Sequence, residues 1–291
     1  MSNIVNDEYP GKKVLSDEDL KAKLAADFTF SAAPQTEDIK YDFPTEVIDL
    51  PSKGWFYPEG HPLSSGKIEM KYMTAKEEDI LSSANLIKQG VVIDKLLQSL
   101  IVTKVNYDDI LLADKNAIFI AARILAYGPD YEVEITCPNC GTKSKHHIDL
   151  TSFEEKDVDF THLPKNKNRF PFTLPASKKS IEVGLLTHGD EKRIAEEVKK
   201  NSKFTKLIGV DTELSTRLKF LIKSVEGNED QTAINKFVDN MLSRDSLALR
   251  NFLKDITPDI DTTFEFACPS CDYVQEKMAM PITVGFFWVG A

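Results

Sequence analysis

The sequence predicts an α+β protein: a core that contains a zinc ribbon, an inserted lobe that mixes helices with a hairpin, and an extended N-terminal arm. Three observations support this prediction. Two Cys-x-x-Cys pairs each follow a run of alternating residues, as strands do. The 127 residues between Cys140 and Cys268 carry their own helical and strand-like periodicities. The first 44 residues are polar, with only scattered apolar positions.

The four cysteines of the chain form one candidate metal site. They are Cys137, Cys140, Cys268 and Cys271. A two-residue gap lets one tight turn present two sulfurs to the same ion, and Zn²⁺ prefers four thiolates in a tetrahedron. We therefore expect one structural zinc ion held by all four residues. The alternative is a pair of knuckle-shaped turns with reduced thiols and no metal.

Other cysteine chemistries fit the pattern less well. Four thiolates leave no open position for water, which disfavours a catalytic zinc. Disulfides across two-residue loops are strained, and the N-terminus lacks the basic and hydrophobic regions of a secretory signal. A thioredoxin-like motif opens a helix, whereas strand-like sequence flanks both pairs here.

The distance between the two pairs predicts the domain organisation. A compact ribbon closes over a much shorter interval, so we expect the metal to hold the two ends of a long insertion. The core domain is expected to comprise residues 45–150 and 263–291, and the inserted lobe residues 151–262. Residues 1–44 form the arm, with one short helix ending near Ala25. The arm is either a disordered tail or a segment that orders on a neighbouring subunit.

The elements of the core follow from periodicity and capping signals. Thr74 and Glu77 form a capping box at the start of a helix that should end at Gly90, and Asp114 is the expected N-cap of a helix that ends at Gly128. The expected strands are 46–50, 67–73, 131–136, 142–147, 263–267 and 272–276, and the expected helices are 74–88, 91–102 and 115–126.

The inserted lobe should begin with a hairpin of residues 170–174 and 180–186. Four helices are expected to follow, over residues 189–200, 212–225, 232–242 and 246–256. The lobe has no phosphate-binding glycine loop, and His188 has no visible nucleophile partner, so we expect no catalytic site there.

Composition limits the classes of function. The 291 residues carry a net charge of −10 and contain no run of eighteen apolar residues, which predicts a soluble, intracellular protein without a membrane span. This charge disfavours nucleic-acid binding by the whole protein. A local basic patch remains open as an alternative, provided that Lys143, Lys145, Lys165, Lys167 and Arg169 gather on one face.

Several short stretches, together with both cysteine pairs, resemble the baseplate hub proteins of T4-like contractile-tailed bacteriophages. The stretches are Leu50–Pro58, Met73–Leu81, Asp94–Leu97, Asp114–Ala117, Ala121–Ile124 and Tyr127–Gly128. The likeness covers about residues 45–150 and resumes at the second cysteine pair. It implies a non-enzymatic component of the virion tail baseplate that is assembled in the host bacterial cytoplasm, with other baseplate, hub and tail proteins as partners and no small-molecule substrate.

Two alternatives to a structural subunit remain open at this point. One is an assembly chaperone that is absent from the mature virion, and the other is a zinc-ribbon factor that binds nucleic acid.

Two aromatic clusters are the candidate contacts with partner proteins. For Trp55, Phe56 and Tyr57 we expect at least one ring to pack internally and at least one to face a neighbouring subunit, the alternative being that all three are core residues. We expect the C-terminal run with Phe286, Phe287 and Trp288 to dock on another protein, because it is too apolar for water. The competing interpretation is a strand that covers the protein's own core.

Overall fold

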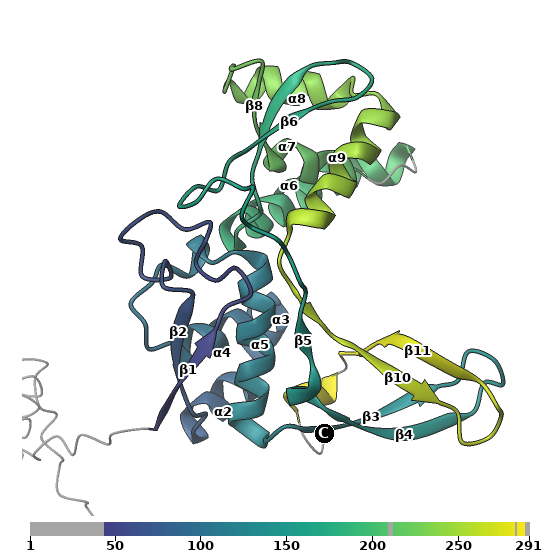
Figure 1. The fold of residues 1–291 in the computed structure, drawn as a ribbon. Coiled ribbons are helices and arrows are strands. Elements are labelled where there is room, and N and C mark those ends of the chain that lie inside the picture. Colours follow the sequence, from purple (N-terminus) through teal and green to yellow (C-terminus); the bar gives the residue numbers. More distant parts are fainter. Residues whose placement is uncertain (1–43, 209–211, 283, 289–291) are drawn as a thin grey trace, which may run out of the picture. The chain divides into compact units, whose positions relative to one another are not determined.

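The computed structural model describes residues 44–208, 212–282 and 284–288, and it confirms a mixed α+β fold (Figure 1). The arm expected over residues 1–44 lies almost wholly outside the described residues. The helices are α2 (Ala75–Ser82), α3 (Ala84–Gln89), α4 (Val92–Leu100), α5 (Leu112–Tyr127), α6 (His188–Ile208), α7 (Glu213–Leu221), α8 (Gln231–Asp239) and α9 (Ser243–Ile256).

The strands form small antiparallel sheets. They are β1 (Thr45–Asp49), β2 (Lys67–Lys71), β3 (Asp130–Thr136), β4 (Lys143–Asp149), β5 (Glu154–Glu155), β6 (Phe170–Thr173), β7 (Ser180–Val183), β8 (Ile222–Val225), β9 (Ile260–Asp261), β10 (Thr263–Ala267) and β11 (Val274–Ala279). The pairs β1–β2, β3–β4, β5–β9 and β10–β11 are two-stranded, and β6–β7–β8 is three-stranded.

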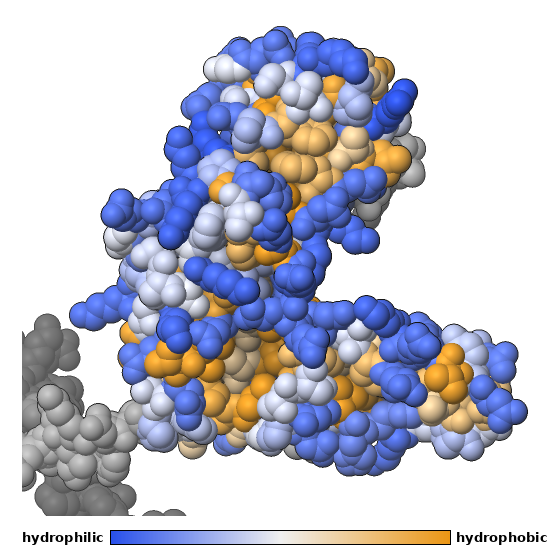
Figure 2. Space-filling view, in the orientation of Figure 1, coloured by the Kyte–Doolittle hydropathy of each residue, from blue (hydrophilic) through white to orange (hydrophobic). Residues whose placement is uncertain are grey.

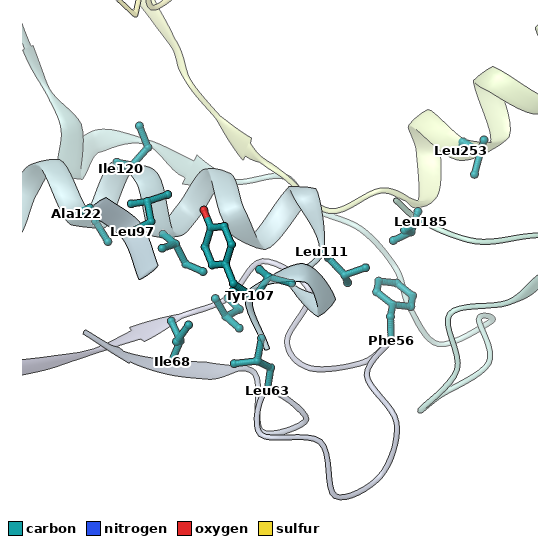
Figure 3. Close-up of a cluster of buried hydrophobic side chains, with 14 of the residues drawn as sticks. Phe56, Leu63, Ile68, Leu97, Tyr107, Leu111, Ile120, Ala122, Leu185 and Leu253 are labelled. Atoms are coloured by element: carbon teal, nitrogen blue, oxygen red, sulfur yellow. The ribbon is translucent and has the colours of Figure 1, made fainter. Parts of the chain in front are cut away.

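One buried hydrophobic cluster connects the helices with the loop between β1 and β2. Phe56 and Leu63 of that loop belong to the same buried cluster as Leu97 of α4 and Ile120 of α5, and Phe56 lies beside Leu111 and Leu185 (Figure 3). The loop reverses tightly at Gly54, whose φ is +74° and whose Cβ position would lie 2.3 Å from the Ser64 carbonyl oxygen. Only glycine fits there, because an added methyl group has no space.

The first predicted helix is divided into two. Ser83 adopts an extended conformation and ends α2, and α3 begins at the next residue. The amide of Ser83 donates to the Ile80 carbonyl, which closes a tight turn in place of a continuous helix. The predicted ends of this segment are confirmed, because Thr74 and Glu77 form the capping box and Gly90 is a left-handed C-cap.

The predicted N-cap role of Asp114 is wrong. Helix α5 starts at Leu112 with Leu111 as its N-cap residue, so Asp114 lies in the first turn. Its buried carboxylate accepts hydrogen bonds from the Ser52 amide (3.0 Å), the Ser52 hydroxyl (2.7 Å) and the Tyr57 hydroxyl (2.7 Å). A side chain that could cap a helix is used instead to attach the loop to α5.

The segment of residues 151–262 contains one strand that the sequence prediction took for helix. The β6–β7 hairpin is confirmed, but the expected helix 212–225 ends at Leu221, and Ile222–Val225 pairs with β7 as β8. Ile222 and Val225 are buried in this sheet. Their β-branched side chains suit a strand, and tertiary pairing decides between the two conformations.

The two ends of the stretch 156–259 meet through paired strands. Glu154 and Glu155 of β5 pair with Asp261 and Ile260 of β9 (Figure 1). A second junction lies near the start of α6, where the Leu112 amide donates to the Leu186 carbonyl and the His188 amide to the Ile110 carbonyl.

Candidate metal centre

Two hairpins build the site, and the first of them has one exposed and one buried face. In β3, Tyr131, Val133 and Ile135 are buried, while the residues between them are exposed. In β10, Phe266 is fully buried, and its ring lies 4.9 Å from that of His146 on β4. Period-two alternation therefore gives β3–β4 a buried face, and a contact from that hairpin reaches β10.

Each Cys-x-x-Cys pair occupies the turn at the end of its hairpin. The Cys137 amide donates to the Thr142 carbonyl, and the Gly141 amide donates back to the Cys137 carbonyl, both at 2.9 Å. In the second turn the Cys268 amide donates to the Tyr273 carbonyl at 3.0 Å. In both turns the amide of the first cysteine thus donates to a carbonyl five residues later.

The four thiols converge between the hairpin ends. Their sulfur atoms all lie within 4.8 Å of one another, with 3.8 Å between Cys137 and Cys271 and 3.6 Å between Cys140 and Cys268. Tetrahedral coordination with metal–sulfur bonds of about 2.3 Å places sulfurs about 3.8 Å apart, so the set has the donor chemistry and the spacing for Zn²⁺. The structure thus brings together all four predicted ligands.

Polar groups near the thiols were not identified from the sequence. The Asn139 side chain lies 3.7 Å from the Cys271 sulfur of the opposite hairpin, and the Ser270 amide donates to the Cys268 sulfur at 3.4 Å. The Thr142 hydroxyl lies 3.3 Å from the Cys140 sulfur. Groups of this kind orient thiolate ligands around a metal. Their positions inside or just after the Cys-x-x-Cys turns are the signal that could have identified them.

Local hydrogen bonds and neighbouring thiols set the pKa values of two cysteines apart. Hydrogen bonds with the side chain and backbone of Thr142 lower the pKa of Cys140 to about 6. The Ser270 amide also acts to lower the pKa of Cys268, but desolvation and the other three thiols outweigh it and raise that pKa to about 11.

The basic residues of the first hairpin do not form a free cationic face. Lys143 pairs with Glu134 at 2.9 Å and Lys145 with Glu132 at 2.5 Å, both across the β3–β4 ladder. Arg169 pairs with Glu182 and Glu229, and Lys165 lies over the Trp55 ring. These pairings neutralise three of the five residues proposed for a nucleic-acid patch.

The first aromatic cluster lies largely inside the protein. Phe56 and Tyr57 are buried, and Phe56 makes edge contacts with Phe160 and Phe170. Trp55 is half-buried, and its indole N–H donates to the Leu163 carbonyl at 3.2 Å. The expectation that at least one ring packs internally is therefore confirmed, and Phe56 and Tyr57 are core residues instead of contact candidates. Contact of the half-buried Trp55 with a neighbouring subunit stays a prediction.

The C-terminal cluster is covered by this chain itself. Phe286 and Phe287 are each 1% exposed, and Phe286 stacks on Phe119 of α5 at 4.9 Å. The Trp288 indole N–H donates to the Leu81 carbonyl of α2 at 3.1 Å. For Phe286 and Phe287 the expected partner contact is replaced by the competing interpretation, with the difference that Val284–Phe286 is a 3₁₀ turn, not a strand. Trp288 is half-buried, and its contact with a partner stays a prediction. Burial against α5 removes the apolar area from water without a partner.

The helices show whether the described chain could cross a membrane, and likeness to known proteins bears on its identity. Among the helices that the structure describes, none is long and apolar enough to cross a membrane. The family model of the T4 bacteriophage base plate protein matches residues 47–288, which includes the segment between the cysteine pairs where the sequence motifs showed no likeness. Neither curated proteins nor solved structures give a significant match. Because the match spans most of the chain, this protein belongs to the T4 bacteriophage base plate protein family.

Proposed function

We propose that this protein is a structural subunit of the hub, or of the region next to the hub, in a phage tail baseplate. It acts through contacts with other baseplate and tail proteins, not as an enzyme, and it is assembled in the cytoplasm of the infected bacterium. Membership of the base plate family supports the baseplate, and the ordered motifs from Leu50 to Gly128 support the hub.

One observation carries the structural role: four thiols from two hairpins more than a hundred residues apart converge within 4.8 Å. A single Zn²⁺ held by Cys137, Cys140, Cys268 and Cys271 would fasten these hairpins together. Because thiols stay reduced in a bacterial cytoplasm, metal coordination replaces a disulfide as the cross-link there. The chemistry supplied by the ion is structural, since four thiolates fill its coordination shell.

In this proposal the zinc site also defines the domains. Residues 45–150 and 263–291 form the core, and residues 151–262 form an inserted lobe whose ends are joined by the β5–β9 pair. The metal would then hold residues 45–150 and 263–291 in a fixed position relative to each other. The lobe would extend from this core.

Mass spectrometry of purified phage particles tests the assignment to the virion. We expect the chain in mature particles, at a stoichiometry fixed relative to the other baseplate proteins. A chain found in assembly intermediates but missing from mature particles would assign it as an assembly chaperone instead.

Metal analysis of the purified full-length protein tests the zinc site. We expect one zinc per chain and a lower melting temperature after chelation. Cys268→Ser should lose the metal, whereas the matched control Asp272→Asn, which changes an exposed neighbour without removing a thiol, should keep it. A metal-free protein whose melting temperature is unchanged by chelation would refute the zinc site. The assignment to the virion would not be affected, because mass spectrometry of the particles tests it separately.

A further inference from the structure

Strand β1 has an unpaired outer edge in the part of the chain that the structure describes, where it pairs with β2 in a two-stranded sheet. The Tyr72 amide donates to the Pro44 carbonyl at 3.2 Å, and hydrogen bonding alternates along an antiparallel strand, so even-numbered residues of β1 face β2. The amides and carbonyls of Thr45, Val47 and Asp49 point the other way. No backbone hydrogen bond among the described residues uses these groups.

This edge lacks the features that keep other strands of the protein from pairing with a second chain. A lysine, a proline or a bulge usually blocks an exposed strand edge. Strand β6 contains Pro171, β4 contains Lys143 and Lys145, and the β10–β11 register shifts between Phe264 and Phe266. Strand β1 reads Thr-Glu-Val-Ile-Asp, and its register has no shift. Its outer edge is therefore a template for one more strand.

One apolar side chain of β1 lies in water. Val47 is 58% exposed, and Figure 2 shows hydrophobic side chains at the surface in the region of β1. Side chains alternate along the strand, so Val47 lies on the face opposite to that of Ile48, whose partner Ile68 on β2 is buried. A strand that is added at this edge covers Val47 only if it brings apolar side chains to the same face.

The residues just before β1 have the pattern that this edge requires, although they lie outside the described part of the chain. Ile39, Tyr41 and Phe43 alternate with charged residues, as in a strand with one apolar face. Only Pro44 stands between this segment and β1, and a hairpin needs at least two turn residues. The segment therefore cannot fold back onto β1 of its own chain, whereas β1 of a second copy is open to it.

We propose that residues 39–43 of a second copy pair with the outer edge of β1, and that the exchange is mutual, so that two copies form a symmetric dimer. A continuous strand over residues 39–49 keeps its odd-numbered residues directed outward. A two-fold axis at Thr45 then places Val47 opposite Phe43 of the second copy, a β-branched and aromatic pair of the kind that stabilises sheets.

The same register places Asp49 opposite Tyr41 of the second copy, and no like charges lie directly opposite each other. A slip by one residue would place Asp42 opposite Val47 and turn the apolar side chains to the other face. The dimer follows from the strand edge and the adjoining sequence, and it does not depend on the place of the protein in a baseplate.

The oligomeric state of the full-length protein tests the dimer. Light scattering after size-exclusion chromatography, at loading concentrations from about 1 to about 100 μM, should show a monomer–dimer equilibrium. Val47→Lys should raise the dissociation constant at least about tenfold, because it removes the contact with Phe43 and puts a lysine on the edge. Val274→Lys is the matched control on β11, where Val274 is 54% exposed, and it should leave the constant unchanged.

Circular dichroism of both variants shows that they fold. A monomer at every concentration, an oligomer larger than a dimer, or an equal effect of the two lysine substitutions would overturn the proposal. Absence of the chain from mature particles would refute the virion assignment and leave the dimer unaffected.

Disulfide trapping between two chains of different isotopic labelling tests the register. One chain carries Val47→Cys and the other Phe43→Cys, and directly opposed residues have Cα atoms about 5.5 Å apart, within reach of a disulfide. We expect mass spectrometry to find a disulfide that joins the two substituted positions in different chains. Asp42→Cys in place of Phe43→Cys should not give this product, because its side chain lies on the other face. Equal trapping at positions 42 and 43, or a dimer that traps at neither, contradicts the proposed pairing.

Discussion

Asp114 shows that the surroundings of a side chain, more than its place in the sequence, decide its role. Its carboxylate is fully buried, and burial raises its pKa against the opposing effect of hydrogen bonds from Tyr57 and Ser52. The Tyr57 hydroxyl in turn accepts from the Leu111 amide at 3.0 Å. This one carboxylate thus connects the aromatic loop to the start of α5.

Removal of the Asp114 carboxylate should destabilise the protein strongly. Asp114→Ala leaves three buried donors without an acceptor, and we expect the free energy of unfolding to fall by about 3 kcal/mol. Asp109→Ala, at an exposed position five residues earlier, should change it by less than about 0.5 kcal/mol. Urea unfolding measures both, and a similar small effect for the two variants would show that the loop is held by its apolar contacts alone.

Glu77 should make stability depend on acid pH. Burial acts to raise the pKa of Glu77, but hydrogen bonds from Lys71, Thr74 and Ser99 outweigh it and lower the pKa to about 2, from 4.5 in the unfolded chain. The folded state therefore gains stability above pH 4.5, and this gain is lost as the pH falls toward 2.

Glu77→Gln isolates this contribution. At pH 7 the variant should be less stable by about 2 kcal/mol, and the difference from the unmodified protein should shrink between pH 4.5 and 2. Glu78→Gln is the control, since Glu78 is exposed. A difference that stays constant over that pH range would mean that Glu77 stabilises by packing rather than by its charge.

At the scale of elements, the loop between β1 and β2 depends on one close backbone approach. Gly54→Ala would place a methyl group 2.3 Å from the Ser64 carbonyl oxygen, and we expect it to cost more than about 3 kcal/mol through displacement of the loop. Gly60 has a similar φ of +81° but open space around its Cβ position.

Gly60→Ala should therefore cost only the strain of a left-handed conformation, about 1 kcal/mol. Thermal unfolding of the two variants compares steric crowding with backbone strain at nearly equal φ. Equal losses would show that the loop can shift to admit the methyl group of Gly54→Ala.

The C-terminal 3₁₀ turn is the element whose position the sequence left most open. Phe286 packs against Phe119, Tyr131 and Phe287, and its ring also faces the guanidinium of Arg123. We expect Phe286→Ala to lower the free energy of unfolding by about 4 kcal/mol, the usual cost of a phenylalanine-sized cavity. Ile282→Ala, at a site that is 57% exposed, should be nearly neutral. If Phe286→Ala is as stable as the unmodified protein but is not incorporated into phage particles, this segment contacts a partner protein instead of supporting the core.

For the whole molecule, the proposed metal and the C-terminal turn fasten the chain at two places. The four thiols join the hairpin ends, while the Tyr131 hydroxyl donates to the Pro281 carbonyl and so holds β3 to the segment after β11. The sheet β6–β7–β8 has its own buried residues, including Phe170, Ile181 and Ile222.

Removal of the metal should therefore act locally. After chelation we expect faster hydrogen exchange at the amides of β3, β4, β10 and β11, and unchanged exchange in β6–β7–β8, because the latter sheet packs without the thiols. Hydrogen-exchange mass spectrometry of the full chain, with and without chelator, measures this. Equal acceleration in both regions would mean that the metal supports the fold as one cooperative unit.

The sequence by itself determined the features that short-range rules control. The spacing of Cys137, Cys140, Cys268 and Cys271 specified the candidate ligand set, and alternation of side chains specified the two hairpins that carry it. The capping box at Thr74 and the glycine ends at Gly90 and Gly128 are local as well, since each depends only on its immediate neighbours.

Tertiary structure decided the features that depend on distant partners. Asp114 is a loop anchor because Ser52 and Tyr57 lie beside it, and Ile222–Val225 is a strand because β7 offers an edge. Phe286 and Phe287 are core residues because α5 covers them, although an apolar chain end equally suits a partner protein. The physical reason is the same in each case: burial and pairing energies come from groups far away in the sequence and exceed the local conformational preferences.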